Sequence, residues 1–325
     1  MRALLLDHPG GPESLRIGEA PMPAPGPGEL RIKVAACGLN PVDGKLMRSG
    51  HPKWRWPHIP GLDVAGTVDA VGPDGQGFQI GERVLAHLDM SQPGGLAEYT
   101  LASARAVSRL PVAVDWVTAA SLPCAAFTAW HCITRRLNVG EGQTLLVQAG
   151  AGGVGGFAIQ MARHRGARVL ATCSTANLEH VARLGAEPVD YTRESLPERV
   201  RAATNGRGLD AIVEVFGGAQ AAADLVLLAH NGGMACLQGL PPLDKLVPFT
   251  LAPSLHEVFL GGAHQSGDRQ ALADLVALGD EVLALLAGGA IKPLPMRAVA
   301  HMDAPAALAA LATGHGRGKW VVRIS

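Results

Sequence analysis

The chain has 325 residues, which at about 100–200 residues per domain favours two domains, and its 28 Lys and Arg balance its 28 Asp and Glu. Hydrophobic residues make up 48% of the chain, enough for a packed core, and this excludes a disordered protein. Zero net charge, no basic block and an aromatic content of 4% argue against nucleic acid or an anionic membrane as a partner.

The cysteines and the N-terminal segment predict a cellular compartment. The five cysteines are odd in number and scattered, which disfavours a secreted disulfide framework and favours a reducing environment. The apolar run at residues 3–6 is too short for a secretion signal. No stretch reaches the roughly 18 uncharged apolar residues that span a bilayer. We therefore expect a soluble, cytoplasmic protein.

The first third of the chain is predicted to contain short strands separated by turns. Residues 30–34 alternate apolar and polar side chains after the turn sequence at 25–28. Residues 66–72 and 81–86 are further short strands bounded by glycine. Short strands at close spacing predict a small, partly open β-barrel.

From about residue 118, apolar strands alternate with Ala-rich helices, which predicts a doubly wound parallel sheet. The expected strands are residues 144–149, 168–172, 210–215 and 233–237, and the expected helices are 157–164 and 178–184. A later helix at 269–286 and a last strand at 320–324 form no second unit of this kind. We expect this tail to pack onto the first domain.

Residues 150–155 read Gly-Ala-Gly-Gly-Val-Gly, a G-x-G-x-x-G motif directly after an expected strand and before an expected helix. In that context Gly150 permits a tight turn, Gly152 lets the backbone approach a pyrophosphate and Gly155 allows close helix packing. The N-terminus of the helix supplies N–H groups and a positive dipole end. The motif predicts a dinucleotide site.

The residue about 20 positions after the glycine motif indicates which dinucleotide binds, because an Asp or Glu there would bind the ribose hydroxyl of NAD. Residues 173–177 contain no acid, and the next one is Glu179. The hydroxyls of Ser174 and Thr175 can donate to a 2′-phosphate, which favours NADP(H). A second interpretation, that these residues merely end a strand, stays open.

The two tyrosines exclude one class of dehydrogenase. Short-chain dehydrogenases need a Tyr followed four residues later by Lys, whereas Tyr99 and Tyr191 are followed at that spacing by Ser103 and Ser195. A structural zinc site needs closely spaced cysteines, which are also missing.

Four further motifs accompany the glycine turn. They are Gly38-Leu39-Asn40-Pro41-Val42-Asp43, Pro60-Gly61-Leu62-Asp63-Val64-Ala65-Gly66, Gly94-Gly95-Leu96-Ala97-Glu98-Tyr99 and Thr128-Ala129-Trp130. Together they resemble the medium-chain dehydrogenase/reductase superfamily, in its zinc-independent quinone oxidoreductase-like branch. The resemblance implies a GroES-like barrel domain at 1–120 and 265–325, a Rossmann domain at 121–264, and a homodimer paired through an edge strand at 258–262.

The resemblance also implies a metal-free site. Asn40 stands where the zinc-containing members carry their first Cys ligand, and Leu62 and Asp63 replace their His-Glu pair. Cys124 falls near a further ligand position and is interpreted as a small buried hydrophobe. A metal cluster of Cys124 with His131 and Cys132 is the alternative.

The implied reaction is hydride transfer from NADPH to a quinone or an α,β-unsaturated carbonyl (enone). The resemblance assigns catalytic roles to Asn40 and Thr128, although Asn40 can also form a turn before Pro41. The cofactor-binding candidates are Gly150, Gly152, Gly153, Val154, Gly155, Ser174, Thr175, Tyr191, Val215, Gly239, Ala263 and Lys319. Asn177 departs from the pattern, because relatives commonly carry Lys there for the 2′-phosphate.

Other interpretations remain open at this point. The protein can be a carbonyl reductase like the zinc alcohol dehydrogenases, or a crystallin-like protein that binds a nucleotide without relevant turnover. The loop with His51, Trp54 and Trp56 can line the substrate pocket or anchor itself.

Overall fold

The computed structural model describes residues 1–242, 244, 246–314 and 316–324. The chain divides into two compact units. The barrel unit comprises Met1–Phe127, Leu260–Ala284 and the segment from Pro295 to the C-terminal end. The parallel-sheet unit comprises Thr128–Phe259 and Leu285–Leu294. These units are defined by contacts within the structure, and the domain boundaries expected after residues 120 and 264 stay predictions.

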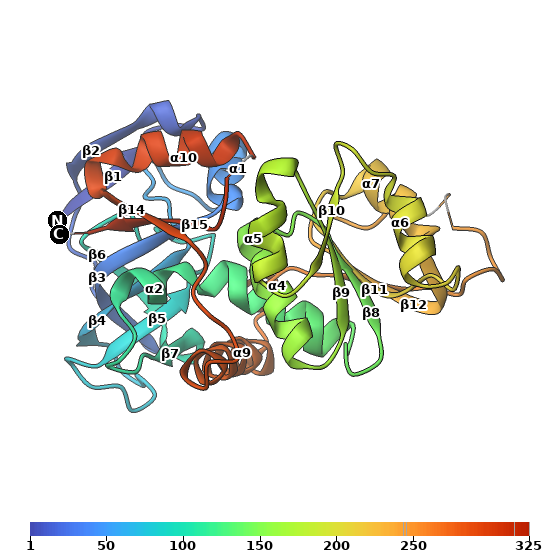
Figure 1. The fold of residues 1–325 in the computed structure, drawn as a ribbon. Coiled ribbons are helices and arrows are strands. Elements are labelled where there is room, and N and C mark those ends of the chain that lie inside the picture. Colours follow the sequence, from blue (N-terminus) through green and yellow to red (C-terminus); the bar gives the residue numbers. More distant parts are fainter. Residues whose placement is uncertain (243, 245, 315, 325) are drawn as a thin grey trace. The chain divides into compact units, whose positions relative to one another are not determined.

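The barrel unit is built on one mixed sheet in the order β14-β15-β3-β4-β5-β7, with β6 also pairing with β3 (Figure 1). The strands are β3 (Glu29–Leu39), β4 (Asp63–Val71), β5 (Arg83–His87), β6 (Tyr99–Ser103), β7 (Val107–Arg109), β14 (Met296–Ala300) and β15 (Lys319–Arg323). The expected alternation is confirmed in β3, where Leu30, Ile32 and Val34 are buried and Lys33 is exposed.

The remaining elements of the barrel unit surround this sheet. They are the hairpin β1 (Arg2–Leu6) and β2 (Leu15–Glu19), and the helices α1 (Pro41–Ser49), α2 (Trp116–Ser121), α8 (Gly262–Gln265), α9 (Arg269–Ala287) and α10 (Ala304–Ala312). The expected tail helix and last strand are confirmed as α9 and β15. The contact of β15 with β3 is antiparallel and brings the C-terminal segment back into the first sheet, as expected.

The second unit is a six-stranded, fully parallel sheet in the order β10-β9-β8-β11-β12-β13. Its strands are β8 (Thr144–Val147), β9 (Arg168–Cys173), β10 (Glu187–Asp190), β11 (Leu209–Glu214), β12 (Leu228–Cys236) and β13 (Ser254–Glu257). Leu145, Leu146 and Val147 are all fully buried, as expected for a strand covered on both faces.

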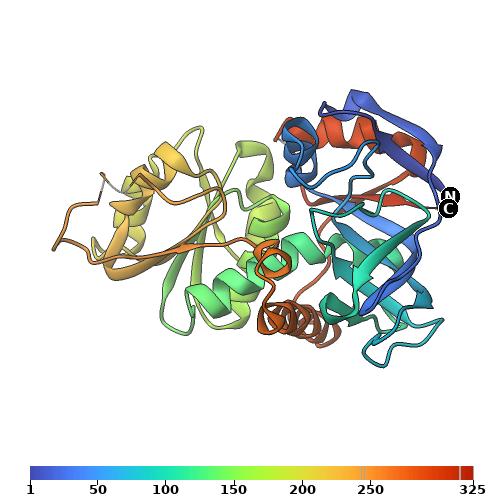
Figure 2. The same ribbon diagram turned by 180° about the vertical axis from the view of Figure 1, so that it is seen from behind.

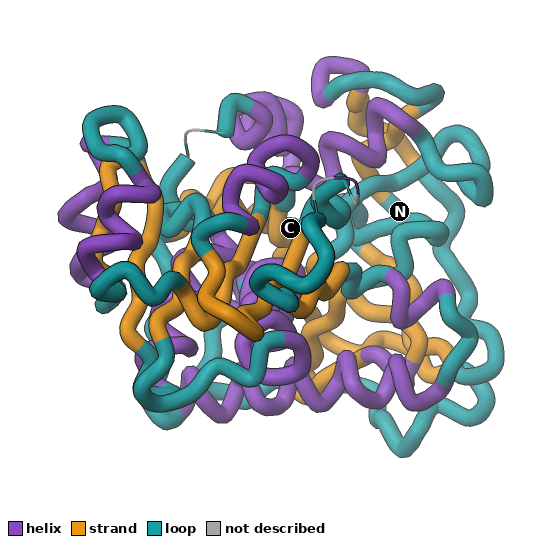
Figure 3. Tube along the Cα trace, turned by 90° about the vertical axis from the view of Figure 1, so that its right-hand side faces the viewer, coloured by secondary structure: helices purple, strands orange, loops and turns teal. Residues whose placement is uncertain are grey.

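Helices cover both faces of this parallel sheet. They are α4 (Gly153–His164), α5 (Leu178–Arg183), α6 (Leu196–Ala203) and α7 (Gly218–Leu225). Figures 1 and 2 show α4 and α5 on one face and α6 and α7 on the other, and Figure 3 colours the helices and strands of the whole chain by type. The expected doubly wound sheet is therefore confirmed. No helix of the described residues is long and apolar enough to cross a membrane.

Several expected boundaries were wrong: β8 ends at Val147 and not at residue 149, and β12 begins at Leu228 and not at residue 233. Two further errors concern the predicted sites. The helix expected from Phe157 begins at Gly153, because the glycines of the motif already adopt helical backbone. The edge strand expected at 258–262 is instead β13, Ser254–Glu257, and Gly262 begins α8. The register explains this shift, since Glu257 pairs with Cys236, the last residue of β12, and the ladder ends there.

A close backbone approach in the barrel sheet gives a stability prediction. A Cβ at Gly66 in β4 would lie 2.1 Å from the carbonyl oxygen of Lys33 in β3. We expect Gly66→Ala to lower the free energy of unfolding by about 1–3 kcal/mol, because the two strands must separate.

The matched control is Gly44→Ala in α1. Apart from the helix backbone, the nearest atom to a Cβ at this position would be the flexible guanidinium of Arg48 in the same helix, 3.5 Å away. It should raise stability by roughly 0.5–1 kcal/mol through helix propensity. Thermal unfolding of both variants checks the pair, and a Gly66→Ala protein as stable as the parent would contradict the packing argument.

Candidate functional site

The chain between β8 and α4 makes the turn predicted to hold a pyrophosphate. Its left-handed residue is Ala149, with φ 51°, rather than Gly150. Gly150 is needed for packing instead, since its Cβ would lie 2.9 Å from the Cβ of Ala171. A Cβ at Gly155 would lie 2.3 Å from the carbonyl oxygen of Ala149, which confirms the expected close packing of the helix.

Helix α4 presents an open N-terminus at this turn. Gly152 is its N-cap, no side chain caps it, and its first turn contains no acidic residue. The N–H groups of Gly153, Val154 and Gly155 belong to the first turn, where no carbonyl oxygen of the helix itself is available to accept a hydrogen bond from them. Together with the positive end of the helix dipole, these groups fit a pyrophosphate.

A buried polar network holds the turn from behind. The hydroxyl of Thr172 accepts a hydrogen bond from the backbone N–H of Ala149 at 3.0 Å and donates to Oε1 of Gln148 at 2.6 Å. Nε2 of Gln148 donates to the buried carboxylate of Asp224 at 2.6 Å. Burial raises the pKa of Asp224, and the hydrogen bond from Gln148 opposes that rise. The network links β8, β9 and α7 at the start of the turn.

The residues expected near a 2′-phosphate follow β9. The amide of Asn177 donates to the hydroxyl of Ser174 at 3.2 Å. The hydroxyl of Thr175 donates to Asp190 at 2.5 Å, so its one proton is directed at that carboxylate. Asp190, at the end of β10, is thus an acid beside this segment that the search along residues 173–177 missed.

The other cofactor candidates of the parallel-sheet unit lie at one edge of its sheet. Tyr191, Val215 and Gly239 follow the carboxyl ends of β10, β11 and β12, where such sheets bind ligands. Tyr191 is 57% exposed. Thr128 is buried at the start of α3 (Thr128–Trp130). Ala263 was expected at a strand end but lies in α8, because β13 already ends at Glu257.

A buried polar cluster occupies the barrel unit, and we call Asn40, Asp63, His87 and Lys319 the Asn40 cluster. Each of the four is at most 4% exposed. Asp63 accepts hydrogen bonds from Nδ2 of Asn40 at 2.8 Å and Nδ1 of His87 at 2.9 Å. The backbone N–H of Cys124 lies 3.0 Å from both carboxylate oxygens of Asp63.

Lys319 completes the cluster. Its ammonium donates to Oδ1 of Asn40 and to the carbonyl oxygen of Leu39, the latter at 3.1 Å, and lies 3.9 Å from Oδ2 of Asp63. The recorded contacts of this amine are therefore in the barrel unit. Its predicted contact with the cofactor stays a prediction.

Strand pairing explains why these four residues meet. Lys319 begins β15, Asn40 follows β3, Asp63 begins β4 and His87 ends β5. These four strands are successive neighbours in the sheet, and Asp63 pairs directly with His87. A charge buried this deeply is stable only when it is paired and hydrogen-bonded, and Asp63 meets both conditions.

Asn40, Asp63 and Cys124 are also the positions where the resemblance places zinc ligands. The described residues contain no group of three His, Cys, Asp or Glu side chains that is arranged to hold a metal ion. Burial raises the pKa of the Cys124 thiol well above its usual value, which keeps the sulfur protonated and a poor ligand. The groups at these three positions are thus an amide, a carboxylate and a protonated thiol, and the ammonium of Lys319 lies beside them.

Asp43 supports Asn40 through the backbone. Its carboxylate accepts hydrogen bonds from the backbone N–H of Asn40 at 2.7 Å and of Leu62 at 3.2 Å. Burial, with a further contribution from the charge of Asp63, raises the pKa of Asp43 to about 7. Asp43 is therefore a structural partner at the start of α1.

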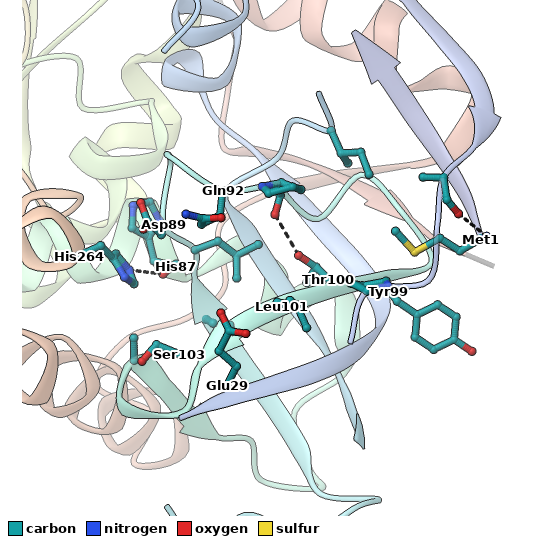
Figure 4. Close-up of a pocket in the computed structure, with 18 of the residues that line it drawn as sticks. Met1, Glu29, His87, Asp89, Gln92, Tyr99, Thr100, Leu101, Ser103 and His264 are labelled. Atoms are coloured by element: carbon teal, nitrogen blue, oxygen red, sulfur yellow. Dashed lines mark hydrogen bonds between the residues drawn. The ribbon is translucent and has the colours of Figure 1, made fainter. Parts of the chain in front are cut away.

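A cavity of about 450 Å³ lies in the barrel unit, and His87 is among its lining residues (Figure 4). His264 bonds the carbonyl oxygen of His87 at 2.9 Å, and the hydroxyl of Thr100 donates to that of Pro93 at 3.3 Å. Glu29 and Asp89 also line this cavity. Of the Asn40 cluster, His87 alone is among the residues that line this cavity.

Trp54 is fixed by contacts inside and outside its loop. Its indole N–H donates to the carbonyl oxygen of Met90 at 2.7 Å, and its ring stacks on His58 with centroids 3.7 Å apart. Trp56 packs edge-on against Trp54 and is 40% exposed. Of the two interpretations of this loop, these contacts support the one in which Trp54 anchors the loop, here to the segment that contains Met90.

Comparison with known proteins agrees with this arrangement. Residues 26–112 match the family model described as alcohol dehydrogenase GroES-like domain, and residues 153–278 match the one described as zinc-binding dehydrogenase. The chain is 33% identical over 310 residues to a quinone oxidoreductase of Sus scrofa, and the alignment covers 93% of each chain. The chain belongs to the medium-chain dehydrogenase/reductase superfamily.

Solved structures of this superfamily superpose on the whole chain. An alcohol dehydrogenase superfamily protein from Novosphingobium aromaticivorans is 30% identical with a TM-score of 0.88, over 100% of both chains. A mycobacterial protein described as complexed with NADPH is 30% identical with a TM-score of 0.87, again over 100% of both chains. The expected fold, a GroES-like barrel with a Rossmann sheet, is confirmed. The protein is a quinone oxidoreductase-like oxidoreductase.

Several supporting residues of this oxidoreductase escaped the sequence analysis. Gln148, Thr172 and Asp224 were not singled out, although a polar side chain inside an apolar strand is a signal for a buried network. His87 and the placement of Lys319 were also missed. A His at the end of an apolar strand carries no pattern of its own, and only the pairing of β4 with β5 brings it to Asp63.

The raised pKa of Asp43 predicts a pH dependence of stability. Between about pH 4 and 7 the folded state retains a proton that the unfolded chain, with a carboxyl pKa of 3.8, releases. The free energy of unfolding should therefore fall as pH rises through this window, by up to about 4 kcal/mol at 1.4 kcal/mol per pKa unit, and level off above it.

Asp43→Asn removes this contribution, so its stability should fall less steeply between pH 4 and 7 than that of the parent. The measurement is the denaturant midpoint across pH 4–8. The exposed Asp74→Asn serves as control and should keep the parent's profile. Identical profiles for the parent and Asp43→Asn would contradict the assignment.

Proposed function

We propose that this protein transfers a hydride from NADPH to a quinone or an enone without a catalytic zinc. The Asn40 cluster carries the proposal, because the amide of Asn40 stands where the zinc-containing relatives carry their first Cys ligand, and the Lys319 ammonium lies against that amide. Hydrogen-bond donors polarise a carbonyl less strongly than a metal does. Quinones and enones, which accept hydride with less help than simple ketones, fit such a site.

The cofactor part of the proposal rests on the glycine turn. The N–H groups of Gly153 and Val154 would bind the pyrophosphate, with Gly150, Gly152 and Gly155 allowing its close approach. Ser174, Thr175 and Tyr191 would surround the 2′-phosphate, and Val215, Gly239, Ala263 and Thr128 would contact the rest of the nucleotide. Bound NADPH supplies the hydride from its nicotinamide ring, and the NADPH complex of a mycobacterial relative supports this choice.

In the barrel unit, Asn40 would donate an amide hydrogen to the carbonyl oxygen of the substrate. Negative charge develops on that oxygen as the hydride arrives, and a fixed donor stabilises it. Asp43 holds the backbone of Asn40 and Asp63 holds its side chain. The final proton would come from water.

We also propose a cytoplasmic homodimer. All five cysteines are free thiols, which fits a reducing compartment. Among the described strands β13 pairs only with β12, which leaves its other edge as the place where a second copy of the chain would add its own strand.

The reaction is tested by NADPH oxidation with 1,4-naphthoquinone, 2-cyclohexenone and, as the control, cyclohexanone. We expect turnover with the first two substrates, little with the saturated ketone, and no loss after dialysis against a chelator. Zinc analysis should find well below one zinc per chain. One tightly held zinc with activity lost on chelation would favour the zinc-type carbonyl reductase, and cofactor binding without oxidation would favour the non-catalytic nucleotide binder.

Cofactor choice is tested at Ser174. Ser174→Asp places a carboxylate beside the expected 2′-phosphate, so NADPH should bind at least about tenfold more weakly, or 1.4 kcal/mol, while NADH changes little. Ser174→Asn is the control, because Asn has the shape of Asp without its charge. Fluorescence titration with both cofactors measures the effect, and equal losses for NADPH and NADH would show that the phosphate is not recognised there.

A further inference from the structure

The ammonium of Lys319 is buried beside two polar side chains, Asn40 and Asp63. The residue is 4% exposed, and its amine bonds to Oδ1 of Asn40 and to the carbonyl oxygen of Leu39. A buried amine is costly unless its donors are used. Its nearest carboxylate oxygen, on Asp63, is 3.9 Å away, so its closest polar contact is the amide and not the acid.

These contacts leave the Asn40 amide one orientation. Its oxygen faces the ammonium of Lys319, and its nitrogen faces Oδ2 of Asp63 at 2.8 Å. A flipped amide would point N–H at the ammonium and oxygen at the carboxylate, two repulsive contacts in a low-dielectric interior. Asp63 itself is held by Nδ1 of His87 and the backbone N–H of Cys124.

One of the two N–H hydrogens of the Asn40 amide is available to a ligand. An Asn side chain carries two N–H hydrogens, and its contacts with the described residues use one of them, on Asp63. A cation on the amide oxygen draws electron density away from the nitrogen, which makes the second N–H a stronger donor.

We propose that Lys319 is a positioning residue of the oxidoreductase: its ammonium fixes and polarises the Asn40 amide, whose second N–H bonds the carbonyl oxygen of the substrate. This inference rests on the proposed function. For an enone, the hydride forms the new C–H bond at the β-carbon, the C=C electron pair moves toward the carbonyl, and the charge on oxygen is met by Asn40 until water protonates the product.

The first test is a double-mutant cycle between Lys319 and Asn40. Lys319→Met should lower kcat by roughly 10- to 100-fold, as loss of an outer-shell partner does, while KM for NADPH stays within about twofold. If Lys319 acts through Asn40, then Asn40→Ala with Lys319→Met should be no slower than Asn40→Ala alone. Fully multiplicative losses would overturn the proposal. The control is Lys33→Met, which removes an exposed lysine of β3.

A second variant separates positioning from neutralisation of Asp63. Lys319→Met leaves a buried carboxylate without its cation and should lower the melting temperature. Adding Asp63→Asn removes that charge and should restore much of the melting temperature. Because Asp63 also holds the Asn40 side chain, kcat is compared with that of Asp63→Asn alone, and the added Lys319→Met should lower it further. Equal kcat values for these two proteins would mean that Lys319 only balances the charge of Asp63, and would overturn the proposal.

A third readout does not depend on turnover. In protein with isotope-labelled Asn, the Asn40 side-chain amide should shift upfield in Lys319→Met, because its nitrogen regains electron density, and should stay in place in Lys33→Met. An unchanged Asn40 resonance would overturn the proposal even if the parent enzyme is active. A shifted resonance in a protein that reduces no quinone or enone would support the positioning and reject the proposed function.

Discussion

The buried carboxylate of Asp63 is the constraint on which the barrel unit's site depends. It is fully buried, and it takes hydrogen bonds from Asn40, His87 and the backbone N–H of Cys124. An acid in such a place must be satisfied on every side or it destabilises the fold. The result is that one carboxylate holds together the end of β3, the end of β5 and the segment after α2.

In the parallel-sheet unit a second buried acid, Asp224, supports the predicted cofactor turn in a similar way. Asp224 receives the amide of Gln148, which in turn accepts from Thr172, and Thr172 holds the backbone of Ala149 at the glycine turn. In both units a buried carboxylate fixes an amide side chain: Asp63 holds Asn40, which is itself the predicted binding group, and Asp224 holds Gln148, which supports the glycine turn through Thr172. A preorganised donor costs no reorganisation during the reaction, which is the physical benefit of such support.

Much of the arrangement was predictable because it depends on local patterns. The parallel sheet follows from apolar runs that alternate with helices, and the glycine turn from Gly150, Gly152 and Gly155 between a strand and a helix. The errors came where pairing, not composition, decides. Residues 258–262 are apolar enough for a strand, but β12 ends at Cys236, and its ladder with β13 stops once the N–H of Val258 has bonded the carbonyl oxygen of Cys236.

The sequence by itself determined the two-unit architecture, the dinucleotide-type turn and the superfamily, since periodicity and short motifs record them. The tertiary structure alone decided which polar side chains act together. Lys319 and Asn40 are far apart in the chain, and they meet only because β15 pairs antiparallel with β3 and carries the amine to the end of that strand. No local sequence pattern predicts this contact, because the contact depends on the register between two strands that come from opposite ends of the chain.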